Sequence, residues 1–210
     1  DTPPPPPPST SEITYVSFSS NGIVGDIPYA DEDILALNTS TGEWSLYFDG
    51  SQVGLSRWDV NAFYVQDDGN ILLSMDSNSY SRELGLVRDS DILKFTPTGL
   101  GTKTAGTLEW FLDGSDVGLN PTSGDIDEIS FTADGRLVIS TVGNLHLADE
   151  TVSNEQRVVL NNGVFGAESS GDWSLYTESS DGNQAATAFS GNSLSLAGDD
   201  ASAASSVFAA

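Results

Sequence analysis

Short apolar runs separated by turn-forming dipeptides make up most of this chain. The runs are rich in Val, Ile, Leu and aromatic residues, and clusters of Gly, Asn, Asp and Ser interrupt them. Asp-Gly occurs at residues 49–50, 68–69, 113–114, 134–135 and 181–182, and Asn-Gly at 21–22 and 162–163. These dipeptides favour the positive φ angles of tight hairpins, most clearly at 68–69 and 134–135, where β-rich runs lie on both sides. No segment has sustained helical periodicity, so the pattern predicts an all-β protein.

The same pattern predicts where the strands lie, because each expected strand is an apolar run bounded by turn residues. We expect strands at residues 13–18, 34–37, 44–48, 60–65, 71–75, 92–95, 108–112, 126–131, 137–141, 157–160, 173–176, 186–189, 193–196 and 206–208.

The chain repeats itself. Residues 33–37 (Asp-Ile-Leu-Ala-Leu) recur as 91–95 (Asp-Ile-Leu-Lys-Phe), and 49–55 (Asp-Gly-Ser-Gln-Val-Gly-Leu) recur as 113–119 (Asp-Gly-Ser-Asp-Val-Gly-Leu). Residues 59–63 and 68–74 return in the same way at 125–129 and 134–140. The repeating unit is therefore about 60 residues long and carries four strands. We expect its apolar positions to be buried on equivalent strands.

These repeats divide the chain into three parts. Residues 1–12 form a Pro-rich spacer or leader, since six consecutive prolines fix the polyproline II conformation. Residues 13–198 form the all-β repeat domain, with a half unit (13–30), two full units (31–88 and 89–145) and a degenerate unit (146–198). Residues 199–210 form a terminal strand or tail of small residues.

Four antiparallel strands in each unit are typical of a propeller blade. The Asp-Ile-Leu, Asp-Gly-Ser-x-Val-Gly-Leu and Asp-Gly-x-Ile/Leu-Leu/Val-Leu/Ile-Ser segments resemble the β-propeller-like repeats of secreted bacterial surface proteins. The resemblance covers residues 13–141, extends more faintly to 196, and implies no particular activity. About three and a half units are fewer than most propellers contain. The chain therefore forms a small ring, completes itself by association, or folds as a β-sandwich of two facing sheets.

Composition excludes several partners. The 210 residues carry a formal charge of −24, from 31 acidic and 7 basic residues, which disfavours nucleic acid because phosphate binding needs the opposite sign. Cysteine is absent, so disulfides and thiolate metal sites are excluded. No apolar run is long enough to span a bilayer. Abundant Ser, Thr, Gly and Asn with few lysines favour an extracellular or cell-surface location.

Paired aspartates are the candidate metal ligands. Two carboxylates that lie two residues apart on a strand share a face and can hold calcium at about 2.4 Å. No pair belongs to an EF-hand loop, and the alternative is that they bond local amides at turns and strand edges. Calcium is the single cofactor that the sequence suggests. The pairs are Asp31 with Asp33, Asp89 with Asp91, and Asp125 with Asp127.

Tryptophans and one sequon are the other candidate sites. Trp44, Trp110 and Trp173 fall near equivalent repeat positions, which favours core packing between sheets. Trp58 lies outside this pattern, and we expect it to be an exposed ligand contact, for instance with a glycan. Asn38 opens an Asn-Thr-Ser sequon and is a candidate glycosylation site.

No arrangement of residues indicates an enzyme. His146 is the single histidine, and no Gly-x-Ser-x-Gly elbow accompanies it. The sequence therefore favours a non-enzymatic, extracellular structural or adhesive protein, a subunit of a filament or other homopolymer joined by strand pairing. The alternative is a monomeric carbohydrate- or calcium-binding β module. Residues 13–18 and 206–208 are the candidate donor strands.

Overall fold

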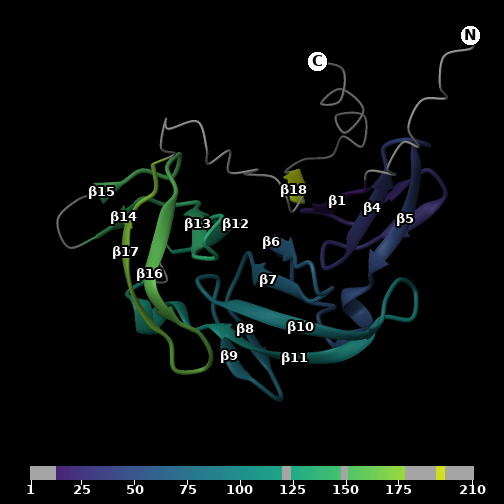
Figure 1. Cartoon of the computed structure of the whole chain (residues 1–210). Helices are drawn as coiled ribbons and strands as arrows, with labels where there is room; N and C mark the ends of the chain where they lie inside the picture. Colours follow the sequence, from purple (N-terminus) through teal and green to yellow (C-terminus); the bar gives the residue numbers. More distant parts are fainter. Residues whose placement is uncertain (1–12, 120–123, 148–150, 178–192, 197–210) are drawn as a thin grey trace, which may run out of the picture.

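The computed structural model describes residues 13–119, 124–147, 151–177 and, for the backbone alone, 193–196 (Figure 1). Their regular elements are β-strands and two short 3-10 helices, so the expected all-β class is confirmed. These strands form three sheets of four strands each, one mixed and two antiparallel, and three two-stranded hairpins. The expected strands at 186–189 and 206–208 lie outside the described residues.

The second and third sheets have the same topology. In each, a hairpin with an Asp-Gly turn forms the inner half and a longer hairpin forms the outer half. Gly69 and Gly135 adopt φ angles of 85° and 83° in the two turns, which confirms the hairpins expected there. The second sheet consists of β6 (Val60–Val65), β7 (Ile71–Met75), β10 (Ile92–Gly99) and β11 (Ala105–Leu112). The third consists of β12 (Ile126–Phe131), β13 (Leu137–Thr141), β16 (Val158–Val164) and β17 (Ser170–Leu175).

The first sheet differs at its inner edge. Its three antiparallel strands are β1 (Ile13–Phe18), β4 (Ile34–Asn38) and β5 (Glu43–Phe48). The innermost position, which β6 and β12 occupy in the other sheets, is filled by β18 (Ser193–Leu196). This strand runs parallel to β1 and comes from the far end of the chain.

A short hairpin follows the second strand position of every sheet. These hairpins pair β2 (Gly22–Val24) with β3 (Ile27–Tyr29), β8 (Ser79–Ser81) with β9 (Gly85–Val87), and β14 (Leu145–His146) with β15 (Thr151–Val152). The sequence did not predict them, because strands of two or three residues with polar members show no apolar alternation.

The Asp-Gly-Ser-x-Val-Gly-Leu segments connect one sheet to the next through 3-10 helices η1 (Gly50–Val53) and η2 (Gly114–Val117). They are connectors and not hairpin turns. A Cβ on Gly50 would collide with the backbone of Glu32, and one on Gly114 with the backbone of Ser90. Glycine is therefore required here for close approach of two backbones.

The sheets are offset from the sequence repeat by half a unit. Strands β6 and β7 belong to the same sequence unit as β4 and β5, but they pair with β10 and β11 of the next unit. Each sheet thus joins the end of one unit to the beginning of the next. Main-chain hydrogen bonds between the strands of one sheet therefore connect neighbouring sequence units.

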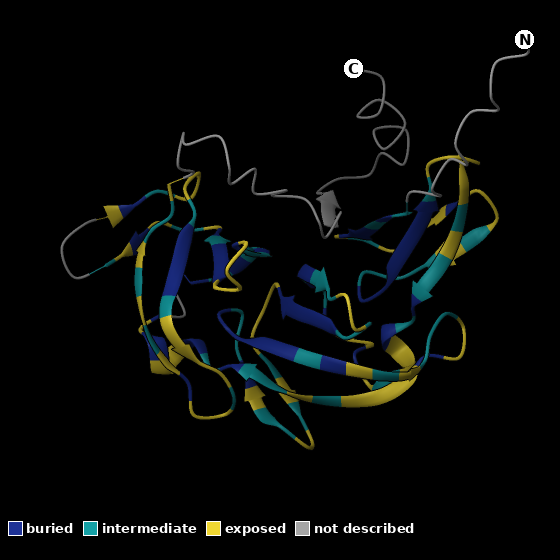
Figure 2. Cartoon of the chain, viewed as in Figure 1, coloured by how far each residue is buried: buried dark blue, intermediate teal, exposed yellow. Residues whose placement is uncertain are grey.

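The three sheets are arranged in an arc, with β18, β6 and β12 at its centre and β5, β11 and β17 at its outside (Figure 1). Strand β6 contacts both β12 and β18. Apolar clusters fill the space between neighbouring sheets. The outermost strands β11 and β17 consist mostly of exposed and half-buried residues (Figure 2). The repeated apolar positions are buried, as expected: Ile34, Leu35, Leu37, Ile71, Leu73, Ile92, Leu93, Phe95, Leu137 and Ile139.

Candidate functional site

Asp33 and Asp91 hold the connectors in place. Each carboxylate accepts one hydrogen bond from the backbone N–H three residues earlier, at 2.8 and 2.7 Å. Each accepts a second from the glycine that opens the 3-10 helix, Gly50 at 3.0 Å and Gly114 at 2.9 Å. Burial raises the pKa of both carboxyls, that of Asp91 to about 6. These two candidate ligands therefore carry a structural task.

Asp31 and Asp89 are tied to the short hairpins. The backbone N–H of each donates to the side-chain oxygen of an asparagine, Asn21 or Asn78, at 3.0 Å. In the third sheet the N–H of Asn154 makes the same bond with Asn144 at 3.1 Å. The hydrogen bond is a repeated feature of the fold that does not require an aspartate side chain.

Asp125 lies where the second and third sheets meet, and Asp127 follows it on β12. Asn61 Nδ2 donates to Asp125 Oδ1 at 2.9 Å, and Ser140 Oγ donates to Asp127. Burial, with the nearby Asp89 carboxylate, raises the pKa of Asp125 to about 7. Over the described ranges, no three His, Asp or Glu side chains are arranged so that they could hold a metal ion. The six predicted ligands thus do not converge on one centre there.

Trp58 is buried, so the expectation of an exposed ligand contact is wrong. Its side chain is 6% exposed and belongs to the core cluster that includes Phe48, Leu55 and Val60. Its backbone N–H donates to Leu55 O at 2.8 Å. The loop after η1 folds back over the core, which the local sequence does not reveal.

The other three tryptophans are half-buried but not all equivalent. Trp44 pairs with Leu37 and Trp173 pairs with Leu160, which occupy the same place in their sheets. Trp110 lies two residues farther along its strand and pairs with Leu93. Each of the three side chains is partly buried against an apolar cluster, as expected. The strand register nevertheless separates Trp110 from the other two.

Asn38 ends β4 at the start of a tight turn. Its side-chain oxygen accepts hydrogen bonds from the backbone N–H groups of Ser40 at 3.0 Å and Thr41 at 3.1 Å. The oxygen of the sequon asparagine thus shapes the β4–β5 turn. Its role as a glycosylation site stays a prediction.

A repeated joint connects the outer strands of neighbouring sheets. Between the first and second sheets, Gly101 N donates to Tyr47 O at 2.7 Å, and Asp49 N donates to Thr104 Oγ1 at 2.9 Å. Between the second and third sheets, Gly166 and Ser169 make the same bonds with Phe111 and Asp113 at 2.9 and 3.0 Å. The four residues before β11 and before β17 therefore begin with glycine and end with a hydroxyl residue.

The first sheet lacks this joint sequence. The four residues before β5 are Thr-Ser-Thr-Gly, in which the glycine comes last. A further sheet cannot attach to the first one through the same pair of hydrogen bonds.

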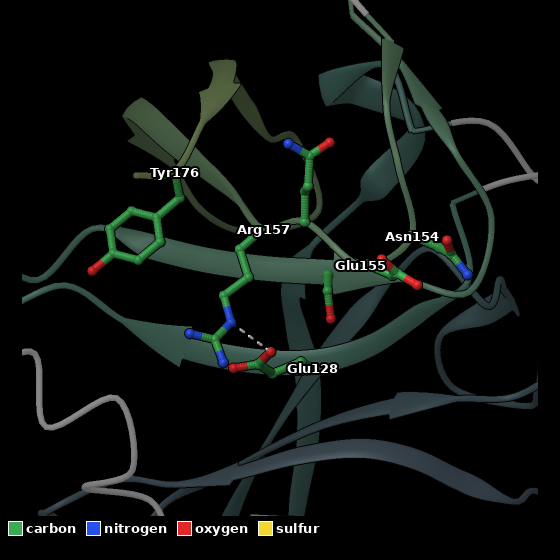
Figure 3. A pocket seen from close by; sticks show the side chains of 7 residues that line it. Glu128, Asn154, Glu155, Arg157 and Tyr176 are labelled. Carbon is green, nitrogen blue, oxygen red and sulfur yellow. Dashed lines mark hydrogen bonds and ion pairs between the residues drawn. The ribbon is translucent and has the colours of Figure 1, made fainter. Parts of the chain in front are cut away.

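A polar pocket of about 350 Å³ lies at one end of the third sheet (Figure 3). Arg157 Nε donates to Glu128 Oε2 at 2.8 Å, and each side chain is 28% exposed. Tyr176 lies beside Arg157 at one end of the pocket, and Glu155 and Asn154 lie toward the other (Figure 3). The lining residues are Glu128, Ser140, Asn154, Glu155, Gln156, Arg157 and Tyr176.

Strand register shows which residues take these places in the second sheet. Val158 pairs with Ile139 as Leu93 pairs with Leu73, so Arg157 corresponds to Ile92. Glu128 pairs with Ser140 as Ala62 pairs with Ser74, so Glu128 corresponds to Ala62. Ile92 is 0% exposed and Ala62 3%. The third sheet therefore has an ion pair where the second has buried apolar residues.

Comparisons with protein-family models, with curated proteins and with solved structures found no match for this chain. No helix in the described ranges is long and apolar enough to cross a membrane. The functional argument therefore depends on the residues themselves.

Sequence reasoning missed both the polar pocket and the joints. The third unit is too degenerate for its Arg157 to be aligned with Ile92 without strand pairing. The sequence contains one weak indication of the joint, which is that Gly-x-x-Thr at 101–104 and Gly-x-x-Ser at 166–169 each precede a strand. Four-residue patterns of this kind are common, so spacing alone does not identify them.

Proposed function

We propose that this protein is a non-enzymatic, extracellular surface component whose copies join into a filament or other homopolymer by exchanging a β-strand. The observation that carries the proposal is the pairing of β18 with the inner edge of β1. In the second and third sheets the equivalent strands, β7 and β13, are covered by the strands that precede them in sequence, β6 and β12. In the first sheet β1 is covered by β18, which comes from the far end of the chain. An edge that accepts a distant strand of its own chain can accept the same strand from a neighbour.

Strand exchange suits the charge of this chain. At −24, copies repel one another, so surface ion pairs cannot be the main source of attraction. Main-chain hydrogen bonds to β1 are independent of side-chain charge, and alternate side chains of an inserted strand reach the core. Assembly is therefore expected to strengthen as salt screens the repulsion.

We further propose that the three sheets are blades of an incomplete propeller. The gathering of β18, β6 and β12 at one centre supports this arrangement over two facing sheets. The two identical joints between outer strands support it as well, because propeller blades repeat one neighbour contact. The missing joint sequence before β5 favours an arc that does not close through this contact.

The experiment uses an engineered disulfide, which is simple to interpret because the chain has no cysteine. Ser17 and Ser195 are partners in the β1–β18 register, so Ser17→Cys/Ser195→Cys introduces two cysteines at paired backbone positions. Oxidation of the concentrated protein should yield a ladder of linked chains on a non-reducing gel. Only intramolecular bonds at every concentration would contradict strand exchange.

A matched pair within one hairpin provides the control. Ala36 and Ser45 face each other on β4 and β5, which are neighbours in sequence. Ala36→Cys/Ser45→Cys should give only bonds within a chain. Electron microscopy of the unmodified protein then shows whether polymers form without the cross-link.

A second candidate function is carbohydrate binding by individual copies. The polar pocket of the third sheet favours it, because carboxylate, amide and hydroxyl groups line it together with the ring of Tyr176. Glycan binding and assembly use different parts of the molecule and are compatible in an adhesive surface protein.

A further inference from the structure

The innermost strands of the second and third sheets run antiparallel to their neighbours, whereas β18 does not. Strand β6 pairs with β7, and β12 with β13, in the antiparallel direction. Strand β18 pairs with β1 in the parallel direction. Parallel pairing is slightly less stable per residue than antiparallel pairing. Within one chain, the inner edge of β1 is therefore covered by a strand that runs in the less favourable direction.

Ser17 is a second sign that β18 matches the inner edge of β1 incompletely. Ser17, Ser74 and Ser140 occupy the same position in β1, β7 and β13, because the residue before each one pairs with the equivalent residue of the next strand in its sheet. Ser74 Oγ donates to Asp91 O at 2.8 Å, and Ser140 Oγ donates to Asp127 Oδ1. Ser17 is 0% exposed, but its Oγ has no hydrogen-bond partner among the described residues. Such a hydroxyl is costly to bury.

The inner strands of the other two sheets carry Asn or Asp at a bulge next to the residue that pairs with this serine. Asp127, which accepts from Ser140, lies at the bulge in β12. Asn61 lies at the same bulge in β6, and its Nδ2 donates to Asp125 Oδ1 at 2.9 Å. The side-chain oxygen of either residue type can accept a hydrogen bond from a serine hydroxyl. A complete inner strand thus brings an acceptor to this position.

Residues 192–196 have the sequence pattern of such an inner strand. They read Asn-Ser-Leu-Ser-Leu, and residues 61–65 read Asn-Ala-Phe-Tyr-Val. In both segments an asparagine is followed by apolar residues at the third and fifth positions, which lie on one face of a strand. The segment that contains β18 therefore resembles β6, although it comes after all three sheets in the chain.

This alignment gives the register that the segment has when it pairs in the antiparallel direction. Ser193 lies opposite Ser17, in the way that β6 pairs with β7. Asn192 takes the bulge position, where its side-chain oxygen can accept the hydrogen bond from Ser17 Oγ. Leu194 lies opposite Val16, as it also does in the parallel register. The antiparallel register keeps this pairing and also provides the buried hydroxyl with a partner.

We propose that the inner edge of β1 also accepts residues 192–196 of a neighbouring copy in the antiparallel direction, with Asn192 bound to Ser17. The proposal rests on the strand exchange proposed above and adds a second register to it. Within one chain, residues 178–192 connect the third sheet to β18, so this connection restricts the direction of the strand. A strand from another copy is free of that restriction, and its direction is set by pairing.

A cysteine pair that can meet only in the antiparallel register tests the proposal. In that register Leu196 lies opposite Thr14, whereas in the parallel register it pairs with Phe18, four residues away. Four residues of a strand span about 13 Å, which is too far for a disulfide. We expect oxidation of concentrated Thr14→Cys/Leu196→Cys to link chains into a ladder on a non-reducing gel, with no bond within a chain. Ser17→Cys/Ser193→Cys reports the same register and replaces this pair if it fails to fold.

Substitution of Asn192 tests the acceptor, because the Thr14→Cys/Leu196→Cys chain keeps Ser17. Asn192→Ala in this background should lower the linked fraction several-fold at a given protein concentration. Asn192→Asp keeps an acceptor, as Asp127 does in the third sheet, and should restore most of the linking. All variants are compared at about 0.5 M NaCl, so that the added charge of the aspartate is screened.

Two outcomes would overturn the proposal while strand exchange stands. One is a ladder from Ser17→Cys/Ser195→Cys, which reports the parallel register, but none from Thr14→Cys/Leu196→Cys. The other is equal linking with and without Asn192→Ala. A ladder from neither cysteine pair would contradict strand exchange itself and this proposal with it.

Discussion

Asp91 Oδ1 accepts a hydrogen bond of 2.9 Å from the backbone N–H of Gly114, 23 residues farther along the chain. The bond joins the start of β10 to the connector that leaves the second sheet. Asp33 and Gly50 form its counterpart in the first sheet at 3.0 Å. These two bonds explain why Asp-Ile-Leu and Asp-Gly-Ser recur together in the sequence.

Asp91→Asn should destabilise the protein by about 1–3 kcal/mol. The reason is that the NH₂ group of the new side chain then faces the backbone N–H of either Arg88 or Gly114, and that N–H loses its acceptor. Urea unfolding followed by tryptophan fluorescence measures the change. Asp68→Asn, at an exposed hairpin turn, is the control and should cost less than about 0.5 kcal/mol. Equal effects at both positions would contradict the structural role of Asp91.

Thr104→Ala should separate the first two sheets at their outer strands. Thr104 is 3% exposed, accepts from Asp49 N at 2.9 Å and donates to Gly101 O at 2.7 Å. Loss of the hydroxyl should cost about 1–2 kcal/mol, because the partly buried N–H of Asp49 loses its acceptor. Thr104→Ser should restore most of this stability, since Ser169 does the same in the other joint. A serine variant as unstable as the alanine variant would argue against the joint.

Stability should fall as the pH rises from about 4 to about 7. Burial raises the pKa of Glu32 and Asp125 to about 7 and that of Asp59 to about 6. Because the folded protein retains protons that the unfolded chain loses near pH 4, this contribution is complete below about pH 4 and disappears as each folded pKa is passed. The melting temperature should thus be several degrees higher at pH 5 than at pH 8.

Asp125→Asn separates this titration from general charge repulsion. The variant keeps an oxygen for Asn61 but has no proton to lose, so its melting temperature should depend less on pH than that of the unmodified chain. Measurement at about 0.5 M NaCl screens the surface charges. If the melting temperature of the variant depended on pH as strongly as that of the unmodified chain, Asp125 would not contribute to the pH dependence of stability.

Millimolar calcium should leave the melting temperature unchanged, because Asp33, Asp91 and Asp125 already accept hydrogen bonds from the protein. Scanning calorimetry with calcium, with magnesium and with a chelator checks this. A rise specific to calcium, abolished by Asp127→Asn, would instead establish a calcium site, since a ligand of the native state stabilises it.

Local patterns were enough to predict most strands of the three sheets. Residues 60–65 and 71–75 were expected as strands and form β6 and β7, because the turn between them is built from the adjacent residues 66–70. The hairpin strands β8 and β14 escaped prediction, since two or three residues carry too little periodicity. The burial of Trp58 was not predicted for a different reason, which is that it depends on core residues far away in the sequence.

By itself, the sequence determined the all-β class, the repeat and the buried positions, because apolar alternation and turn chemistry act over a few residues. Only the tertiary structure decided that β6 and β7 pair with the following unit, that β18 covers β1, and that Arg157 replaces Ile92. Pairing between strands far apart in the chain is set by which edges and apolar faces remain unoccupied after local folding. That competition involves the whole molecule, so no local pattern encodes its outcome.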